Sequence, residues 1–176
     1  MSRGNWLSRL LGRKAEGEGA PTGPPLAQRS PEREAEYREQ CGRAEQELAA
    51  GRHEEALACF ERALEIDPGD SDLWKGRGRA LLALDRLEEA VACFERALMI
   101  APRDSPLWAN KGVALLRLRR FQEALACFDC ALEIAPDQSV LWFAKGTALA
   151  QLGRDQEAET CFRRAAWPAD ERRERR

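Results

Sequence analysis

The stretch ACFERAL at residues 58–64 is repeated letter for letter at residues 92–98. Two variants follow at the same spacing, ACFDCAL at residues 126–132 and TCFRRAA at residues 160–166, so each copy begins 34 residues after the one before it. A fixed period of this size marks an array of similar supersecondary units. The period, rather than the length of 176 residues, therefore decides the expected fold.

Each period carries the signals of two helices joined by a short turn. A serine such as Ser71 offers a helix N-cap three residues before Trp74, so the first helix of a unit should begin there. A polar turn such as Asp85-Arg86 precedes the second helix, which ends before a proline because proline cannot continue a helix. The repeated signals are Ser71, Ser105 and Ser139; Trp74, Trp108 and Trp142; and Pro68, Pro102 and Pro136.

A glycine lies inside three of the first helices, where it costs about 1 kcal/mol relative to alanine. Such a cost must be offset by packing, so we expect the two helices of a unit to approach closely at the glycine. Phenylalanine and alanine form the apolar stripe of the second helix that would face it. These residues are Gly78, Gly112 and Gly146; Phe94, Phe128 and Phe162; and Ala90, Ala124 and Ala158.

This succession of Trp, Gly, Ala, Phe, Ala and Pro in 34 residues resembles the tetratricopeptide repeat family. The resemblance implies an all-α fold, a right-handed solenoid of four helix-turn-helix repeats. The sequence departs from the family where Arg77, Lys111 and Lys145 replace the usual leucine before the glycine. We expect the repeat domain to span residues 30–170, with units at about 37–70, 71–104, 105–138 and 139–170.

Both ends of the array indicate that it is complete with four units. Glu39-Gln40 stands where the inner units have a Leu-Trp pair, and Glu159 and Ala166 replace apolar residues of the last second helix. Terminal repeats need such polar outer faces to stay soluble.

Three segments lie outside the repeats. Residues 1–14 form a predicted basic amphipathic helix, residues 15–29 a flexible linker rich in Gly and Pro, and residues 171–176 a charged tail. The first segment offers an attachment point made of Trp6, Leu7, Leu10 and Leu11 together with Arg3, Arg9 and Arg13.

Composition and charge exclude several functions. A formal net charge of −2 argues against nucleic acid as the main partner. No run of about 18 apolar residues exists, so no membrane span is predicted. His53 is the single histidine and lies in a turn, and the glycines are single rather than clustered as in a phosphate-binding loop. We therefore predict no enzyme activity, no cofactor and no metal.

The six cysteines are predicted to be reduced thiols of a cytoplasmic protein. Four recur with the repeat and should be buried: Cys59, Cys93, Cys127 and Cys161. Cys127 and Cys130 spell C-x-x-C within a helix, but no second pair or nearby histidine completes a metal site. Cys41 and Cys130 are the two thiols expected to react.

The resemblance also implies a concave groove lined by the first helices. In the first unit it assigns Arg38, Cys41 and Glu45 to the groove. Beyond that unit, the residues expected to contact a ligand are Lys75, Arg79, Asn110, Val113, Arg117, Phe143 and Thr147. Basic residues in the middle and apolar ones at the far end suit an acidic peptide with a hydrophobic anchor.

One family subgroup clamps a C-terminal carboxylate with lysine, asparagine and basic residues. Lys75 and Asn110 match that pattern, but Arg79, Val140 and Ala144 depart from it. The sequence does not fit a chaperone cofactor, although Lys75, Arg79 and Asn110 could still hold a carboxylate.

The function expected from these features is that of a non-enzymatic adaptor that holds a partner peptide in the groove. Two alternatives depend on the N-terminal segment. Residues 2–14 could contact an anionic membrane weakly, as in a membrane-peripheral assembly factor, or they could be the transit peptide of an organelle protein. The oligomeric state stays open.

Overall fold

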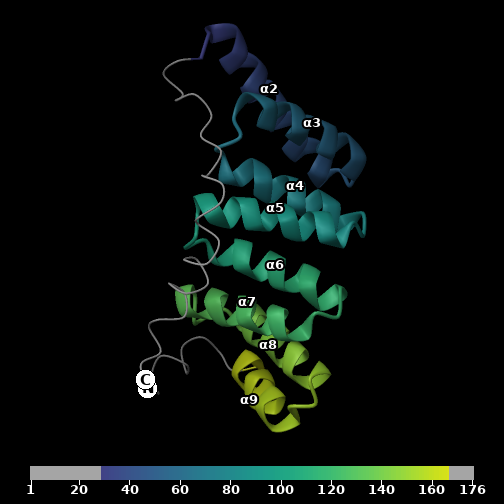
Figure 1. Ribbon diagram of the computed structural model, residues 1–176, viewed down its shortest axis with the longest axis vertical. Coiled ribbons are helices and arrows are strands. Elements are labelled where there is room, and N and C mark those ends of the chain that lie inside the picture. The colour runs from purple at the N-terminus through teal and green to yellow at the C-terminus, as the bar shows by residue number, and fades with distance from the viewer. Residues whose placement is uncertain (1–28, 167–176) are drawn as a thin grey trace.

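Eight helices in four pairs make up residues 29–166, the part of the chain that the computed structural model describes, and no strand occurs in that part. They follow one another along the long axis of the molecule (Figure 1). In chain order they are α2 (Pro31–Ala49), α3 (His53–Ile66), α4 (Ser71–Ala83), α5 (Leu87–Ile100), α6 (Ser105–Arg117), α7 (Phe121–Ile134), α8 (Ser139–Gln151) and α9 (Asp155–Ala166). The predicted all-α solenoid of four helix pairs is confirmed. The N-terminal helix and the charged tail proposed from the sequence lie outside the described residues, as does nearly all of the proposed linker.

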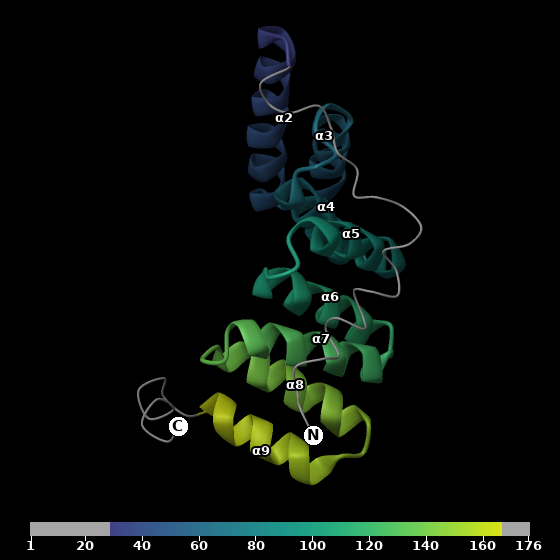
Figure 2. The same ribbon diagram turned by 60° about the vertical axis from the view of Figure 1, so that its left-hand side comes forward.

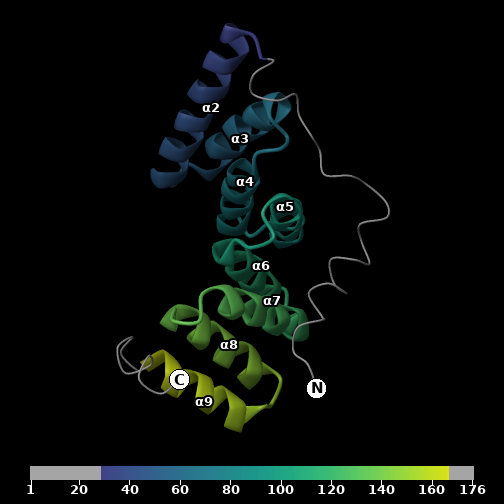
Figure 3. The ribbon, with the colours of Figure 1, turned by 90° about the vertical axis from the view of Figure 1, so that its left-hand side faces the viewer.

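The helices stack so that each one packs between its chain neighbours (Figures 2 and 3). Successive first helices also contact one another, α2 with α4, α4 with α6 and α6 with α8, whereas successive second helices lie further apart. The first helices therefore form the inner row of a curved stack, and their exposed faces line its concave side.

The glycines are explained by phenylalanine rings. A Cβ atom added to Gly78 would lie 2.6 Å from the ring of Phe94 in the second helix of the same unit. At Gly112 the corresponding distance to the Phe128 ring is also 2.6 Å. Both rings are fully buried. The ring occupies the volume that a side chain on the first helix would need, which offsets the low helix propensity of glycine.

The first unit uses a different arrangement. Ala44 stands 34 residues before Gly78, at the place of the missing glycine, and the ring of Phe60 lies against Gly76 of the next unit instead. A Cβ atom on Gly76 would overlap that ring. α4 thus carries Gly76 in addition to its repeat glycine Gly78, and Phe60 lies beside the space between α2 and α4.

The helix caps differ in part from the prediction. Ser30 does cap α2, by accepting a hydrogen bond from the backbone N–H of Arg33. Ser71 and Ser105 do not cap α4 and α6, because the carboxylates of Asp70 and Asp104, one residue earlier, accept the bonds from the first turn. The Ser105 hydroxyl is buried and donates to the carbonyl of Ala131 at 3.0 Å.

Polar contacts join neighbouring units at three equivalent places. The indole N–H of each repeat tryptophan, Trp74, Trp108 and Trp142, donates to a proline carbonyl in the preceding connection, as Trp108 does to Pro102 at 2.9 Å. Beside it, the cation before the glycine reaches the second helix of the unit before, as Lys111 does to Glu95 at 2.9 Å. The other ion pairs of this kind are Arg77 with Glu61 and Lys145 with Asp129. This contact explains why a cation replaces the family's leucine.

The packing account predicts opposite effects for two glycine-to-alanine changes. Gly112→Ala should destabilise the protein by about 1–3 kcal/mol, because the added methyl group overpacks the Phe128 ring. Gly42→Ala, in the open middle of α2, should stabilise it by up to about 1 kcal/mol through helix propensity. Urea unfolding of both variants measures the difference, and equal shifts would contradict the role given to the ring.

Candidate protein-interaction surface

All seven groove residues chosen beyond the first unit lie on first helices of the inner row. Lys75 and Arg79 lie on α4, and Asn110, Val113 and Arg117 on α6. Phe143 and Thr147 lie on α8. Their surroundings differ, and the ion pairs around the basic residues were not foreseen.

Lys75 already has two acidic partners. Its Nζ atom forms ion pairs with Asp72 in the same helix and, at 3.4 Å, with Asp104 at the start of the next unit. The hydrogen bond with Asp72 is the main cause that raises the pKa of Lys75. Lys75 therefore connects two units, and a ligand carboxylate would have to compete with both aspartates.

Arg117 is occupied in a similar way. Its guanidinium donates to the carbonyl of Leu82 at 2.6 Å and to the carboxylate of Asp85 at 2.7 Å, both in the preceding unit. Asp85 has a left-handed backbone with φ of 62°, so Arg117 also stabilises a strained turn. Arg79 is exposed and forms no ion pair within residues 29–166. Of the three cations among these seven residues, Arg79 alone forms no ion pair within the described part.

The apolar end of the surface is on α8. Val140 is 77% exposed and Phe143 is 61% exposed, the two largest values among the large apolar side chains of residues 29–166. The Phe143 ring rests against Phe162 of α9, with the ring centroids 5.4 Å apart. The Thr147 hydroxyl donates to the carbonyl of Phe143 at 3.0 Å, so it is turned toward its own helix.

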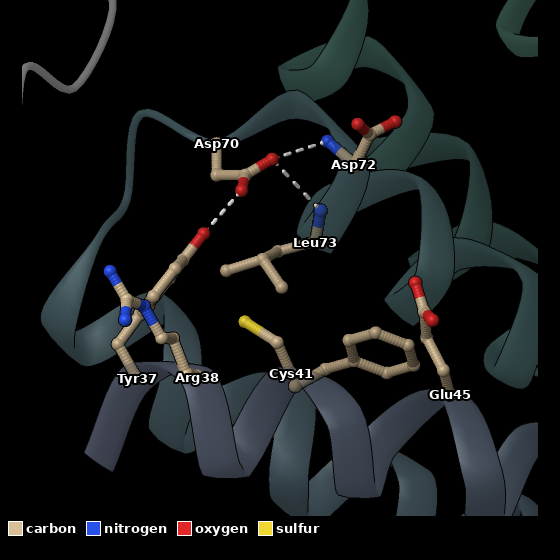
Figure 4. Close-up of a pocket in the computed structure, with 8 residues that line it drawn as sticks. Tyr37, Arg38, Cys41, Glu45, Asp70, Asp72 and Leu73 are labelled. Carbon is tan, nitrogen blue, oxygen red and sulfur yellow. Dashed lines mark hydrogen bonds between the residues drawn. The ribbon is translucent and has the colours of Figure 1, made fainter. Parts of the chain in front are cut away.

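The first unit holds a cavity of about 310 Å³ between α2 and the start of α4 (Figure 4). The three groove positions predicted for this unit all line it, and sequence reasoning missed the others. The lining residues are Tyr37, Arg38, Cys41, Glu45, Phe60, Asp70, Asp72 and Leu73. Ala44, in place of the repeat glycine, was the sequence signal that Phe60 leaves its usual place.

The polar groups of this cavity are organised around Asp70. One of its carboxylate oxygens accepts from the Tyr37 hydroxyl, and the other accepts from the backbone N–H groups of Asp72 and Leu73 (Figure 4). Burial and the hydrogen bond to Asp70 raise the pKa of Tyr37. Asp70 thus holds α2 against the start of α4.

The cysteines are almost all inaccessible. The four repeat-spaced thiols are buried, as predicted, but Cys130 is buried too, at 1% exposure, so the expectation that it would react is wrong. It lies on α7, which is covered by both α6 and α8. Burial raises the pKa of Cys127 to about 11 and that of Cys130 to about 12. Cys41, in the first-unit cavity, is half-buried.

Within residues 29–166, no group of three or more His, Cys, Asp or Glu side chains is placed to hold a metal ion. None of the helices in that range is both long enough and apolar enough to cross a membrane.

A curved stack of helix pairs, with exposed charged and apolar side chains along its inner row, defines a protein-interaction scaffold. Three family models described as tetratricopeptide repeat match the chain, over residues 47–112, 105–138 and 140–166. The chain therefore belongs to the tetratricopeptide repeat family. No curated protein sequence matches it.

Solved structures of MamA have a similar fold. A crystal structure of MamA is 13% identical, with a TM-score of 0.73 over 97% of this chain and 88% of that chain. MamA 41-end from Desulfovibrio magneticus RS-1 is 21% identical, with a TM-score of 0.71 over 74% of this chain and 73% of that chain. MamA MSR-1 is 25% identical, with a TM-score of 0.64 over 72% of each chain. These likenesses support the repeat fold.

The buried thiols predict a loss of stability in alkali. Cys127 and Cys130 are protonated in both states below pH 9, but above it only the unfolded chain ionises them, because their folded pKa values are about 11 and 12. The free energy of unfolding should therefore fall as the pH rises from 9. It should fall less in a Cys127→Ala, Cys130→Ala variant, as urea unfolding at pH 8 and 10.5 would measure. Equal falls would contradict the burial of these thiols.

Proposed function

We propose that the protein is a non-enzymatic adaptor that binds a partner peptide along the inner row of α2, α4, α6 and α8. The observation that carries the proposal is the exposure of Val140 and Phe143 on α8, in a fold that buries most of its other large apolar side chains. Neighbouring exposed apolar side chains on a concave repeat surface are typical of a contact with another protein.

The affinity should come mainly from the apolar end. Burying a phenylalanine side chain is worth about 1.5–3 kcal/mol, whereas an exposed ion pair is worth about 0.2–1 kcal/mol. Phe143 is thus the anchor contact and Arg79 a selectivity contact. An acidic group on the peptide would meet Arg79 first, since Lys75 and Arg117 are engaged by aspartates.

The anchor contact is tested by truncating Phe143. Phe143→Ala should raise the dissociation rate of a captured partner about tenfold, the effect of a contact worth about 1.4 kcal/mol. The melting temperature of this variant should change little, because the Phe143 ring is largely exposed and its one aromatic contact within residues 29–166 is with Phe162. Partners are captured with a photo-crosslinking residue at position 140, and dissociation is followed by surface plasmon resonance.

The matched control for that experiment is Met99→Ala, which removes another exposed apolar side chain from the second helix α5. It should leave dissociation unchanged. A partner that dissociates equally fast from both variants and from the parent would exclude α8 as the anchor.

The charge contact predicts an effect on association instead. Arg79→Glu should slow association and flatten its dependence on salt, because exposed charges steer encounter more than they hold the complex. Arg79 suits this test better than Lys75, whose loss would also disturb Asp72 and Asp104. Arg62→Glu on the second helix α3 makes the same charge change away from the inner row. Equal salt dependence in the two variants would remove Arg79 from the binding surface.

A further inference from the structure

The first-unit cavity has an apolar floor and an acidic rim. Phe60, Leu73 and Cys41 supply its apolar lining. Glu45 and two aspartates lie among the other lining residues (Figure 4). The aspartates are Asp70 and Asp72. A ligand for this cavity must therefore bring an apolar side chain together with positive charge.

The cations near the cavity are largely committed to other acids. Arg38 also lines the cavity, but it forms an ion pair with Glu34 at 3.0 Å. Lys75 neutralises part of the charge of Asp72. Glu45 is exposed and has no ion pair with any residue of the described part. Glu45 is therefore the carboxylate of the rim whose charge is available to a cationic ligand.

The chain itself contains a segment of this chemistry. Residues 1–14 carry four cations, Arg3, Arg9, Arg13 and Lys14, and no acidic residue. They also carry large apolar side chains at helical spacing, beginning with Trp6. Charge and hydrophobic character both complement the cavity.

The segment is tethered at the edge of the cavity. Arg29 is the first residue that the structure describes, and its guanidinium lies over the ring of Tyr37, 4.9 Å from the ring centroid. Tyr37 lines the cavity. Residues 15–28 separate Arg29 from the basic segment, and a random-coil chain of that length would have a root-mean-square span of about 20 Å. Such a tether gives an effective concentration in the millimolar range.

We infer that residues 1–14 dock in the first-unit cavity of their own chain, with an apolar side chain against Phe60 and Leu73 and a cation beside Glu45. The docked segment covers the α2 end of the inner row, so a partner peptide that extends to α2 must displace it. This contact is independent of the anchor proposed on α8, and it goes beyond the adaptor function.

Cys41 reports the occupancy of the cavity. It lines the cavity and is half-buried, whereas the other five cysteines of the chain are buried. Alkylation of Cys41 by the small neutral reagent iodoacetamide, followed by mass spectrometry, thus measures how often the cavity is open. The full-length chain is used throughout.

The first comparison reverses the charge of residues 1–14. With an effective concentration of about 1 mM and a free dissociation constant of about 0.1 mM, the segment would fill the cavity about nine-tenths of the time. Reversing Arg3, Arg9 and Arg13 to glutamate should therefore speed labelling of Cys41 about tenfold. The matched control reverses Arg172, Arg173 and Arg175 at the other end of the chain and should leave the rate unchanged.

The second comparison restores the attraction with opposite signs. Adding Glu45→Lys to the chain with three N-terminal glutamates should slow labelling again. Loss of the Glu45 carboxylate by itself can only speed the labelling of Cys41. That carboxylate helps to raise the pKa of Cys41, and a lower pKa gives more of the reactive thiolate. Glu65→Lys, an exposed position on α3, is the control and should not restore protection.

Three outcomes would overturn the inference. Equal labelling of the parent and the N-terminal variant would show that the segment does not cover the cavity. Protection that rises with protein concentration would assign the occupant to a second copy of the chain. Faster labelling in the C-terminal control would assign it to the tail. Phe143→Ala should not affect labelling, so failure of the α8 anchor and failure of this contact are distinguishable.

Discussion

The packing of a phenylalanine ring on a glycine sets the distance between the two helices of a unit, and the rest of the stack depends on it. Because protein interiors are close-packed, the ring of Phe94 and a side chain at position 78 cannot occupy the same volume. The first unit makes the same kind of contact at another place. Ala44 fills the usual glycine site, and Phe60 packs on Gly76 of the next unit. The ring then forms part of the floor of a cavity between α2 and α4. One packing constraint therefore produces both the regular part of the stack and its one irregular unit.

Hydrogen bonds and ion pairs join neighbouring units at the edges of each interface. In a linear array, stability is close to a sum of unit terms and nearest-neighbour terms, so each interface must be satisfied locally. In three units the indole N–H of the repeat tryptophan and the cation before the repeat glycine do this at equivalent places, as Trp108 and Lys111 show. The aliphatic stem of the lysine covers apolar surface while its charged end reaches the preceding helix. A leucine at this position would supply the apolar cover but not the ion pair.

The period made the helix pairs and the glycine packing predictable from the sequence, because both depend on contacts that recur every 34 residues. The caps were harder to predict, since Asp70 and Ser71 are adjacent and both residue types cap helices well. The ion pairs of the inner row were not predictable. The pairing of Lys75 with Asp104 depends on how one unit is set against the next, and the sequence does not contain that geometry directly. Cys130 was misjudged because its burial depends on the packing of α7 between α6 and α8. The residues predicted for the groove thus lie on first helices, but which of their charges are available emerged only from the stack.

Buried repeat positions and exposed inner-row positions play different roles, and this difference explains how such a stack can recognise a partner. The same core position of α3, α5, α7 and α9 is phenylalanine in all four units. By contrast, one position of the inner row is Cys41 in the first unit and then Lys75, Ala109 and Phe143 in the next three. Packing fixes the first set, and solvent-facing geometry leaves the second set free to differ. The result is a surface that changes from acidic at α2, through ion-paired cations on α4 and α6, to apolar on α8. A peptide bound along it, as we propose, would meet different chemistry at each end, so the order of its charged and apolar residues would decide the direction in which it binds.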